Sequence, residues 1–91
     1  QILSKRRALL HRRAGEILER AYAGQHPRVA ASLATHFERG RDFSKAVTYL
    51  LQAGDNAVAR YANAEALNYY MRGFDLTEKL PEESKAASAR M

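Results

Sequence analysis

Three histidines are the side chains of this sequence best suited to hold a metal ion or to act as a general base. They are His11, His26 and His36, and no two of them form an i, i+4 pair. The chain has no cysteine, and no acid stands at zinc-ligand spacing beside two of the histidines. Ser32 and Thr35 lie near His36, but nothing orients them as a catalytic triad. The sequence therefore predicts no metal site, no cofactor and no catalytic residue, and we expect no enzyme.

Basic side chains are concentrated in the first half of the chain. The first 41 residues hold nine lysines and arginines against three acids, whereas the remaining residues hold six against seven. The candidate partner-contact residues of this half are Arg6, Arg7, Arg12 and Arg13. Such residues can contact phosphates, yet no aromatic residues are interleaved with them and no helix-turn-helix pattern surrounds them. Nucleic-acid binding is the alternative hypothesis; an acidic protein partner or an ordinary solvated face is favoured.

Length and composition limit the remaining classes of function. Ninety-one residues are enough for one domain with a modest core. The absence of cysteine fits a reducing compartment, so a cytoplasmic protein is expected. No apolar run approaches the roughly 20 residues needed to span a bilayer, and no membrane partner is predicted. The chain begins with Gln1 rather than methionine, which favours an excised piece of a longer polypeptide.

The spacing of apolar residues predicts an all-α fold, because helical periodicity continues through the chain and no sustained period-2 alternation occurs. Gly24 and Gly40 are typical helix ends, and Asp42 is a typical N-cap. The four expected helices cover residues 4–23, 27–39, 43–60 and 63–80.

The predicted core follows from the apolar stripe of each helix. Its members are Leu10, Ile17, Leu18, Leu33, Phe37, Leu50, Leu67, Tyr70 and Phe74. Gly54 lies inside the third helix, where it costs roughly 1 kcal/mol relative to alanine. Either the helix breaks at Gly54 or a close helix crossing offsets that cost, and the close crossing is favoured. Gly15 and Gly73 are expected at close-packing points too.

A short pattern of small and large residues repeats along the chain. Ala46, Leu50 and Ala53 recur twenty residues later as Ala66, Tyr70 and Gly73. With Pro27 as the first position of a 34-residue unit, six residues fall where the tetratricopeptide family places small and large apolar side chains, namely Leu33, Ala34, Phe37, Ala46, Leu50 and Ala53. The chain therefore resembles a tetratricopeptide repeat, although Val58 stands where that family has a closing proline.

A narrower resemblance covers residues 3 to about 80. The segments that carry it are 10–13, 34–40, 46–54 and 61–67. They are similar to the helical repeat region that follows the ATPase module in large bacterial signalling proteins, including LuxR-type transcription regulators and multidomain nucleotide cyclases. The resemblance implies a regulatory scaffold that binds a protein partner or neighbouring domains of the parent protein.

The resemblance also implies an architecture. Antiparallel helix pairs over residues 1–81 would form a short right-handed superhelix, and residues 82–91 would be a polar tail, either frayed or the start of a further helix. Tyr69 points away from the expected core and joins the candidate partner-contact surface. Because the ends of the repeat stack look uncapped, the isolated chain is a candidate homodimer.

Overall fold

The computed structural model describes residues 2–80, and this part of the chain is all helical, as the sequence predicts. Four α-helices follow one another, with a short 3-10 helix, η1, before the second. Their bounds are α1 Ile2–Ala21, η1 His26–Val29, α2 Ala30–Arg39, α3 Phe43–Ala59 and α4 Asn63–Thr77. The predicted polar tail, residues 82–91, lies outside the described residues.

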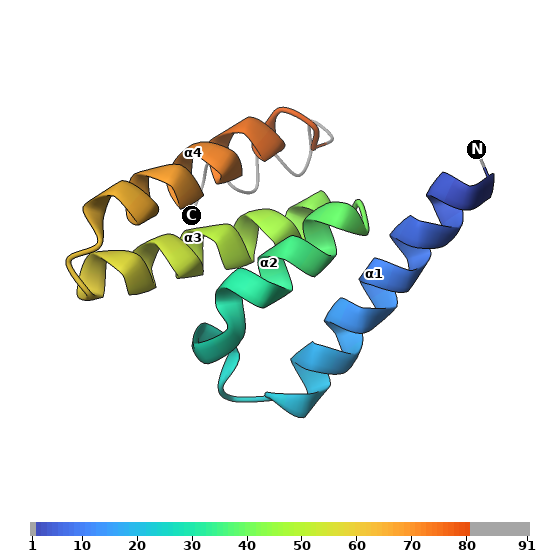
Figure 1. Ribbon diagram of the computed structural model, residues 1–91, viewed down its shortest axis with the longest axis horizontal. Coiled ribbons are helices and arrows are strands. Elements are labelled where there is room, and N and C mark those ends of the chain that lie inside the picture. Colours follow the sequence, from blue (N-terminus) through green and yellow to red (C-terminus); the bar gives the residue numbers. More distant parts are fainter. Residues whose placement is uncertain (1, 81–91) are drawn as a thin grey trace.

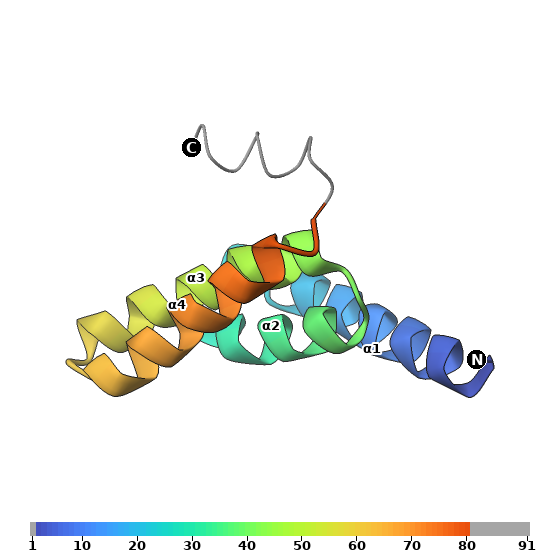
Figure 2. The ribbon, with the colours of Figure 1, turned by 90° about the horizontal axis from the view of Figure 1, so that it is seen from above.

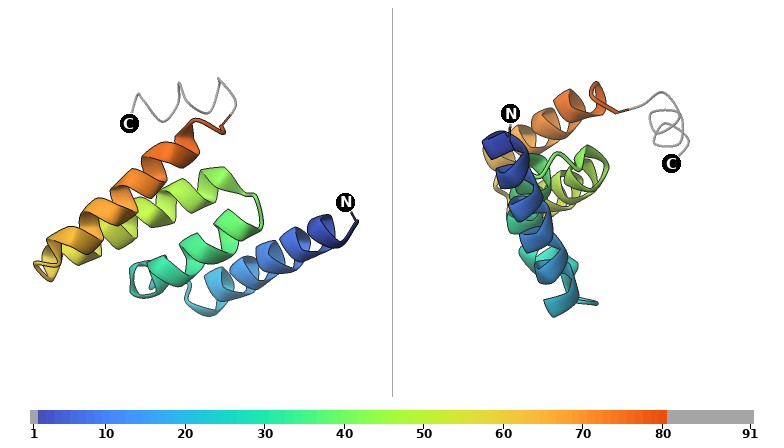
Figure 3. Two further views of the ribbon diagram at one scale, coloured as in Figure 1. Left: turned by 45° about the horizontal axis from the view of Figure 1, so that its top comes forward. Right: turned by 90° about the vertical axis from the view of Figure 1, so that its right-hand side faces the viewer.

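The helices lie beside one another in their order along the chain, and each contacts the next (Figure 1, Figure 3). The N-terminal half of α1 extends beyond the ends of the other helices (Figure 2). As a result, α2 and α3 have neighbours on both sides, whereas α1 and α4 each have one outer face.

The reversals between α2 and α3 and between α3 and α4 have the same backbone geometry. Arg41 (φ 62°) and Tyr61 (φ 61°) both adopt the left-handed conformation. In each turn the next amide donates to the carbonyl oxygen five positions earlier, at 2.9 and 2.8 Å. This is the Schellman motif that commonly ends a helix. The two turns are twenty residues apart, which is the spacing at which the Ala46 pattern recurs in the sequence.

The core lies between α2 and α3, with contributions from the ends of α4. Leu33, Phe37 and Leu50 are fully buried, so their predicted core positions are confirmed. The other buried apolar residues are Ala30, Ala34, Ala46, Val47, Tyr49, Ala53, Ala57, Ala66, Leu76 and Leu80. Asp42 caps α3 as expected, because its side chain accepts a hydrogen bond from the Lys45 amide at 3.3 Å.

The predicted buried face of α1 is wrong. Leu10 and Ile17 are 59% and 65% exposed, and of the residues expected inside, Leu18 is half-buried against the core. The helix instead packs through Gly15, where a Cβ would lie 2.9 Å from Cζ of Phe37. The Phe37 ring lies directly against the α1 backbone at Gly15, where a larger residue would clash, so this side of α1 faces α2 and Leu10 and Ile17 point outward.

The same correction applies to α4. Leu67 and Phe74 were predicted in the core, but both are well exposed, whereas Ala66, Gly73 and Leu76 are buried. As in α1, the face with small residues contacts the neighbouring helix. The apolar stripe that dominates the sequence pattern therefore lies on the outside of both end helices.

The close crossing predicted at Gly54 is confirmed. A Cβ at this position would lie 2.7 Å from Cδ1 of Tyr70, on α4. The Tyr70 hydroxyl donates to Asp55 at 2.6 Å, which holds the ring over the glycine. Tyr70 is half-buried rather than a core residue, because its ring lies at the edge of the α3–α4 contact.

Candidate protein-binding surfaces

Three of the predicted partner-contact arginines are free on the surface of α1. Arg6, Arg7 and Arg13 are exposed, and none of them takes part in an ion pair within the described part of the chain. Exposed arginines gain little from ion pairs within the same chain. These three side chains are therefore available to an incoming partner.

Arg12 has a different role from the one predicted. Its Nε and Nη2 atoms donate to the carbonyl oxygen of Gly40, at 3.1 and 2.8 Å. A Cβ on Gly40 would lie 2.7 Å from the Arg12 backbone nitrogen, so α1 crosses the C-terminal end of α2 at van der Waals distance. The positive charge lies at the negative end of the α2 dipole, which is favourable. Arg12 therefore holds two helices together.

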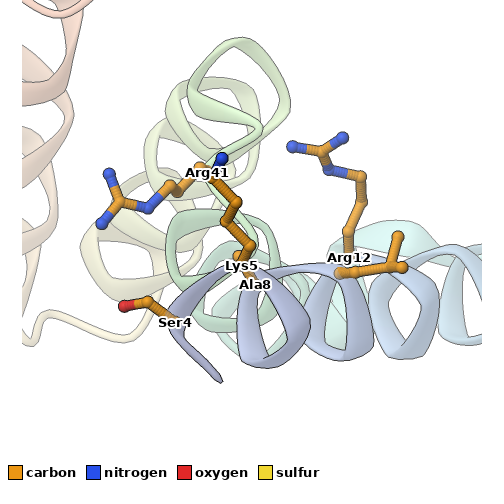
Figure 4. A pocket seen from close by; sticks show the side chains of 6 residues that line it. Ser4, Lys5, Ala8, Arg12 and Arg41 are labelled. Carbon is orange, nitrogen blue, oxygen red and sulfur yellow. The ribbon is translucent and has the colours of Figure 1, made fainter. Parts of the chain in front are cut away.

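A shallow basic hollow opens beside this crossing. It has a volume of about 420 Å³ and is lined by Ser4, Lys5, Ala8, Leu9, Arg12 and Arg41. Figure 4 shows Lys5 and Arg12 extending from α1 on the side of Arg41. An adjoining hollow shares Arg12 and Arg41 and adds Lys79 and Asp42 to its lining. Both hollows are open to solvent, so they attract anions by their charge without enclosing a ligand.

A polar cluster joins α1 to α3. Glu19 accepts hydrogen bonds from Nζ of Lys45 at 2.8 Å and from the hydroxyl of Tyr49 at 2.6 Å. His26 is bonded through Nε2 to the Glu19 carbonyl oxygen at 2.8 Å, and its ring meets Tyr49 edge-on. These residues come from three elements and are up to 30 positions apart in the sequence. No local motif could therefore predict the cluster.

The pKa values of this cluster fit a structural ion pair. Burial alone would raise the pKa of Glu19, but the hydrogen bonds from Lys45 and Tyr49 outweigh burial and lower it. The hydrogen bond to Glu19 raises the pKa of Lys45 against the opposing effect of burial. Burial, followed by the bond to Glu19, raises the pKa of Tyr49. At neutral pH the carboxylate is thus ionised and the phenol is protonated, which keeps α1 attached to α3.

Tyr69 is less available to a partner than the sequence suggests. Its ring packs against the core cluster and lies 5.9 Å from the Arg72 guanidinium carbon. Arg72 in turn pairs with Glu38 of α2 at 2.9 Å. Tyr69 still lines an open hollow of about 340 Å³ on α4, together with Ala64, Glu65, Asn68 and Arg72. Tyr69 is therefore only partly exposed, and a partner would reach it through this hollow.

The three histidines are distributed over two places. His11 and His36 lie near each other, with ring centroids 5.9 Å apart, and His26 belongs to the Glu19 cluster. Within residues 2–80, no group of three histidine, aspartate or glutamate side chains is placed to hold a metal ion.

Large apolar side chains are exposed on three of the helices, and four of them, Leu10, Ile17, Leu67 and Phe74, were predicted in the core. On α1 they are Ile2, Leu3, Leu9, Leu10 and Ile17; on α3 and α4 they are Leu51, Val58, Leu67, Met71 and Phe74. A Cβ on Gly73 would lie 3.7 Å from Cδ2 of Leu51, so Leu51 lies beside α4. Val58 stands seven residues after Leu51 and therefore shares its face of α3.

No protein-family model, no curated protein and no solved structure matches the chain. Of the helices between residues 2 and 80, none has the length and apolar character that a membrane-spanning segment needs.

Proposed function

We propose that the chain is a non-catalytic protein-binding module and that it acts as a scaffold within a larger regulatory protein. The observation that carries the proposal is the exposure of large apolar side chains on the outer faces of both end helices. Leu10 and Ile17 on α1, and Met71 and Phe74 on α4, are each more than half exposed. Several large apolar side chains exposed on one helix are typical of protein-interaction sites.

A tetratricopeptide-like arrangement is part of this proposal, and the 34-residue register supports it. Leu67 stands 34 positions after Leu33, and Met71 stands 34 positions after Phe37. The first residue of each pair is fully buried, and the second is exposed. The Arg72–Glu38 ion pair also joins positions 34 apart. The α4 face is thus what a further helix would cover in a continuing stack.

The basic first helix keeps nucleic-acid binding as the second candidate. The exposed arginines of α1 are free to contact phosphates, and the adjoining hollow adds Lys5 and Arg41. The same outer face carries Leu10 and Ile17, however, and a phosphate backbone offers these side chains no apolar partner. A protein surface satisfies both kinds of residue.

Photo-crosslinking in cells of the source organism tests the proposal. A benzophenone amino acid is placed at Leu10 or Met71 of the full-length protein, with the exposed Thr48 of α3 as the matched control position. We expect discrete protein adducts, identified by mass spectrometry, at positions 10 and 71 and none at 48. Adducts to nucleic acid alone, or no adduct at either position, would contradict the proposed function.

A further inference from the structure

The outer face of α1 carries apolar residues at the spacing of a coiled-coil seam. Leu3, Leu10 and Ile17 are seven residues apart, and they are 67%, 59% and 65% exposed. Ala14 and Ala21 stand four residues after Leu10 and Ile17, so from Leu10 onward the spacing alternates between four and three, whereas Arg7 holds the corresponding position after Leu3. This is the repeat with which one helix packs along another. These five residues are called the α1 seam below.

A row of positive charge runs along one side of this seam. Arg6, Arg13 and Arg20 are also seven residues apart, and all three are exposed. Residues at this spacing stay aligned within about 20° per heptad. No ion pair in the described part of the chain involves any of them. These three residues are called the arginine row.

The opposite side of the seam is already occupied. His11 lies beside His36 of α2, with 5.9 Å between the ring centroids, and Leu18 packs against the core. Gly15, which makes the close contact with Phe37, lies on the same inward side. A partner helix can therefore approach the α1 seam only from the outer side, where it meets the arginine row.

We propose that the α1 seam binds an amphipathic α-helix of a protein partner whose apolar stripe is flanked by glutamate or aspartate. This rests on the proposed protein-binding function and names the class of partner for one of its surfaces. The apolar stripe would cover the leucines, and the carboxylates would pair with the arginine row. Flanking charges of this kind set which helices associate and in which orientation.

A second copy of the chain does not supply this chemistry. In an antiparallel pair of α1 helices, the arginine row of one copy would face the row of the other. In a parallel pair it would face Ser4, His11 and Leu18, none of which is acidic. Because like charges along a seam oppose association, the described surface fits an acid-flanked helix better than itself.

The experiment compares two designed helical peptides on the intact 91-residue chain. Both peptides have the same leucine stripe over three heptads; one has glutamate and the other lysine at every flanking position. Fluorescence anisotropy should show about tenfold tighter binding of the glutamate peptide, and the preference should shrink as salt is raised. Equal binding, or a preference for the lysine peptide, overturns the proposal without bearing on crosslinks at Leu10 or Met71.

A charge-reversed variant and a matched control locate the effect. The triple variant Arg6→Glu, Arg13→Glu, Arg20→Glu should prefer the lysine peptide. The control Arg28→Glu, Arg39→Glu, Arg60→Glu changes the net charge equally at exposed positions outside α1. It removes the exposed Arg60–Glu65 pair but no residue of the seam, and it should keep the original preference. If the control loses the preference too, overall charge explains the result and the proposal is wrong.

Two further measurements decide the identity of the occupant. Leu10→Gln should weaken the binding of both peptides, because it removes an apolar contact from the seam. If sedimentation equilibrium shows a dimer that Leu10→Gln converts to monomer, the occupant is a second copy. Tighter binding to anionic phospholipid vesicles than to the glutamate peptide would make it a membrane surface. Either of these last two results overturns the proposal.

Discussion

The effect of Gly54→Ala on the free energy of unfolding should depend on the side chain at position 70: it should be destabilising with tyrosine there and stabilising with alanine. Alanine is favoured over glycine in a helix interior by about 1 kcal/mol. Its Cβ would lie 2.7 Å from Cδ1 and 2.8 Å from Cζ of Tyr70, well inside the ordinary carbon–carbon contact of about 3.5 to 4.0 Å. The ring is tied to Asp55 through its hydroxyl, so it cannot move without losing that bond.

The size of the effect follows from these opposing contributions. Overpacking of this kind costs about 1 to 3 kcal/mol, which exceeds the gain in helix propensity. We expect Gly54→Ala to destabilise the chain by about 1 kcal/mol, a fall in melting temperature of about 4 to 8 °C. In a Tyr70→Ala background the clash is absent, and the same change should stabilise by about 1 kcal/mol.

Urea unfolding of the four proteins in a double-mutant cycle measures this coupling. The cost of Tyr70→Ala itself cancels in the cycle, so the coupling of about 2 kcal/mol reports the contact. If Gly54→Ala is equally stabilising in both backgrounds, the ring does not lie over the glycine. An α3–α4 crossing that requires glycine at position 54 would then be refuted.

Three other substitutions test separate parts of the structure. Gly40→Ala should cost about 2 kcal/mol or more in urea unfolding, because its Cβ meets the Arg12 backbone, which cannot turn aside; a neutral result would contradict the close crossing. Leu50→Ala should cost about 2 to 5 kcal/mol, since Leu50 is fully buried; an unchanged unfolding curve would remove it from the core. The pKa of Glu19 is lowered from 4.5 in the folded chain, so its ionised form adds stability above that pH, which is lost as the pH falls through the lowered pKa. Glu19→Gln should therefore be less stable than the parent near neutral pH and approach it in acid; a difference that stays constant with pH would count against the ion pair with Lys45.

The ends of α3 and the existence of all four helices could be predicted from the sequence, because glycine, proline and capping residues act locally. At Gly54 the sequence favoured a close helix crossing over a break in the helix, although the residue that approaches, Tyr70, lies on another helix. The turn at Asp42 is a purely local example. Such local signals depend on neighbours in sequence, so they act independently of how the helices pack.

Which sides of α1 and α4 pack against the rest of the fold could not be predicted in the same way. Leu10 and Ile17 form the stronger apolar stripe, but Gly15 determines which side of α1 contacts α2. A small chain has little interior to cover apolar stripes on both of its outer helices. Glycine and alanine allow the closest approach, so their faces turn inward, and the large side chains of Leu67 and Phe74 are left outside.

In the candidate site, too, local features could be predicted from the sequence and distant contacts could not. The sequence identified the arginines of α1 as exposed and basic, which holds for Arg6, Arg7 and Arg13. It gave no reason to separate Arg12 from them, because its partner is a backbone carbonyl 28 residues away. Contacts of this length have no signature in the periodicity of either helix.

The contact between Arg12 and Gly40 also affects how the chain should unfold. α2 has only ten residues, and isolated helices shorter than about 12 to 15 residues are marginal in water. Its C-terminal carbonyl at Gly40 depends on a side chain from α1, and its buried Phe37 depends on the surface of Gly15. Hydrogen exchange should therefore show the middle of α1 and the last turn of α2 opening together as one cooperative unit. Removal of α1 should therefore destabilise α2 as well, because both contacts would be lost.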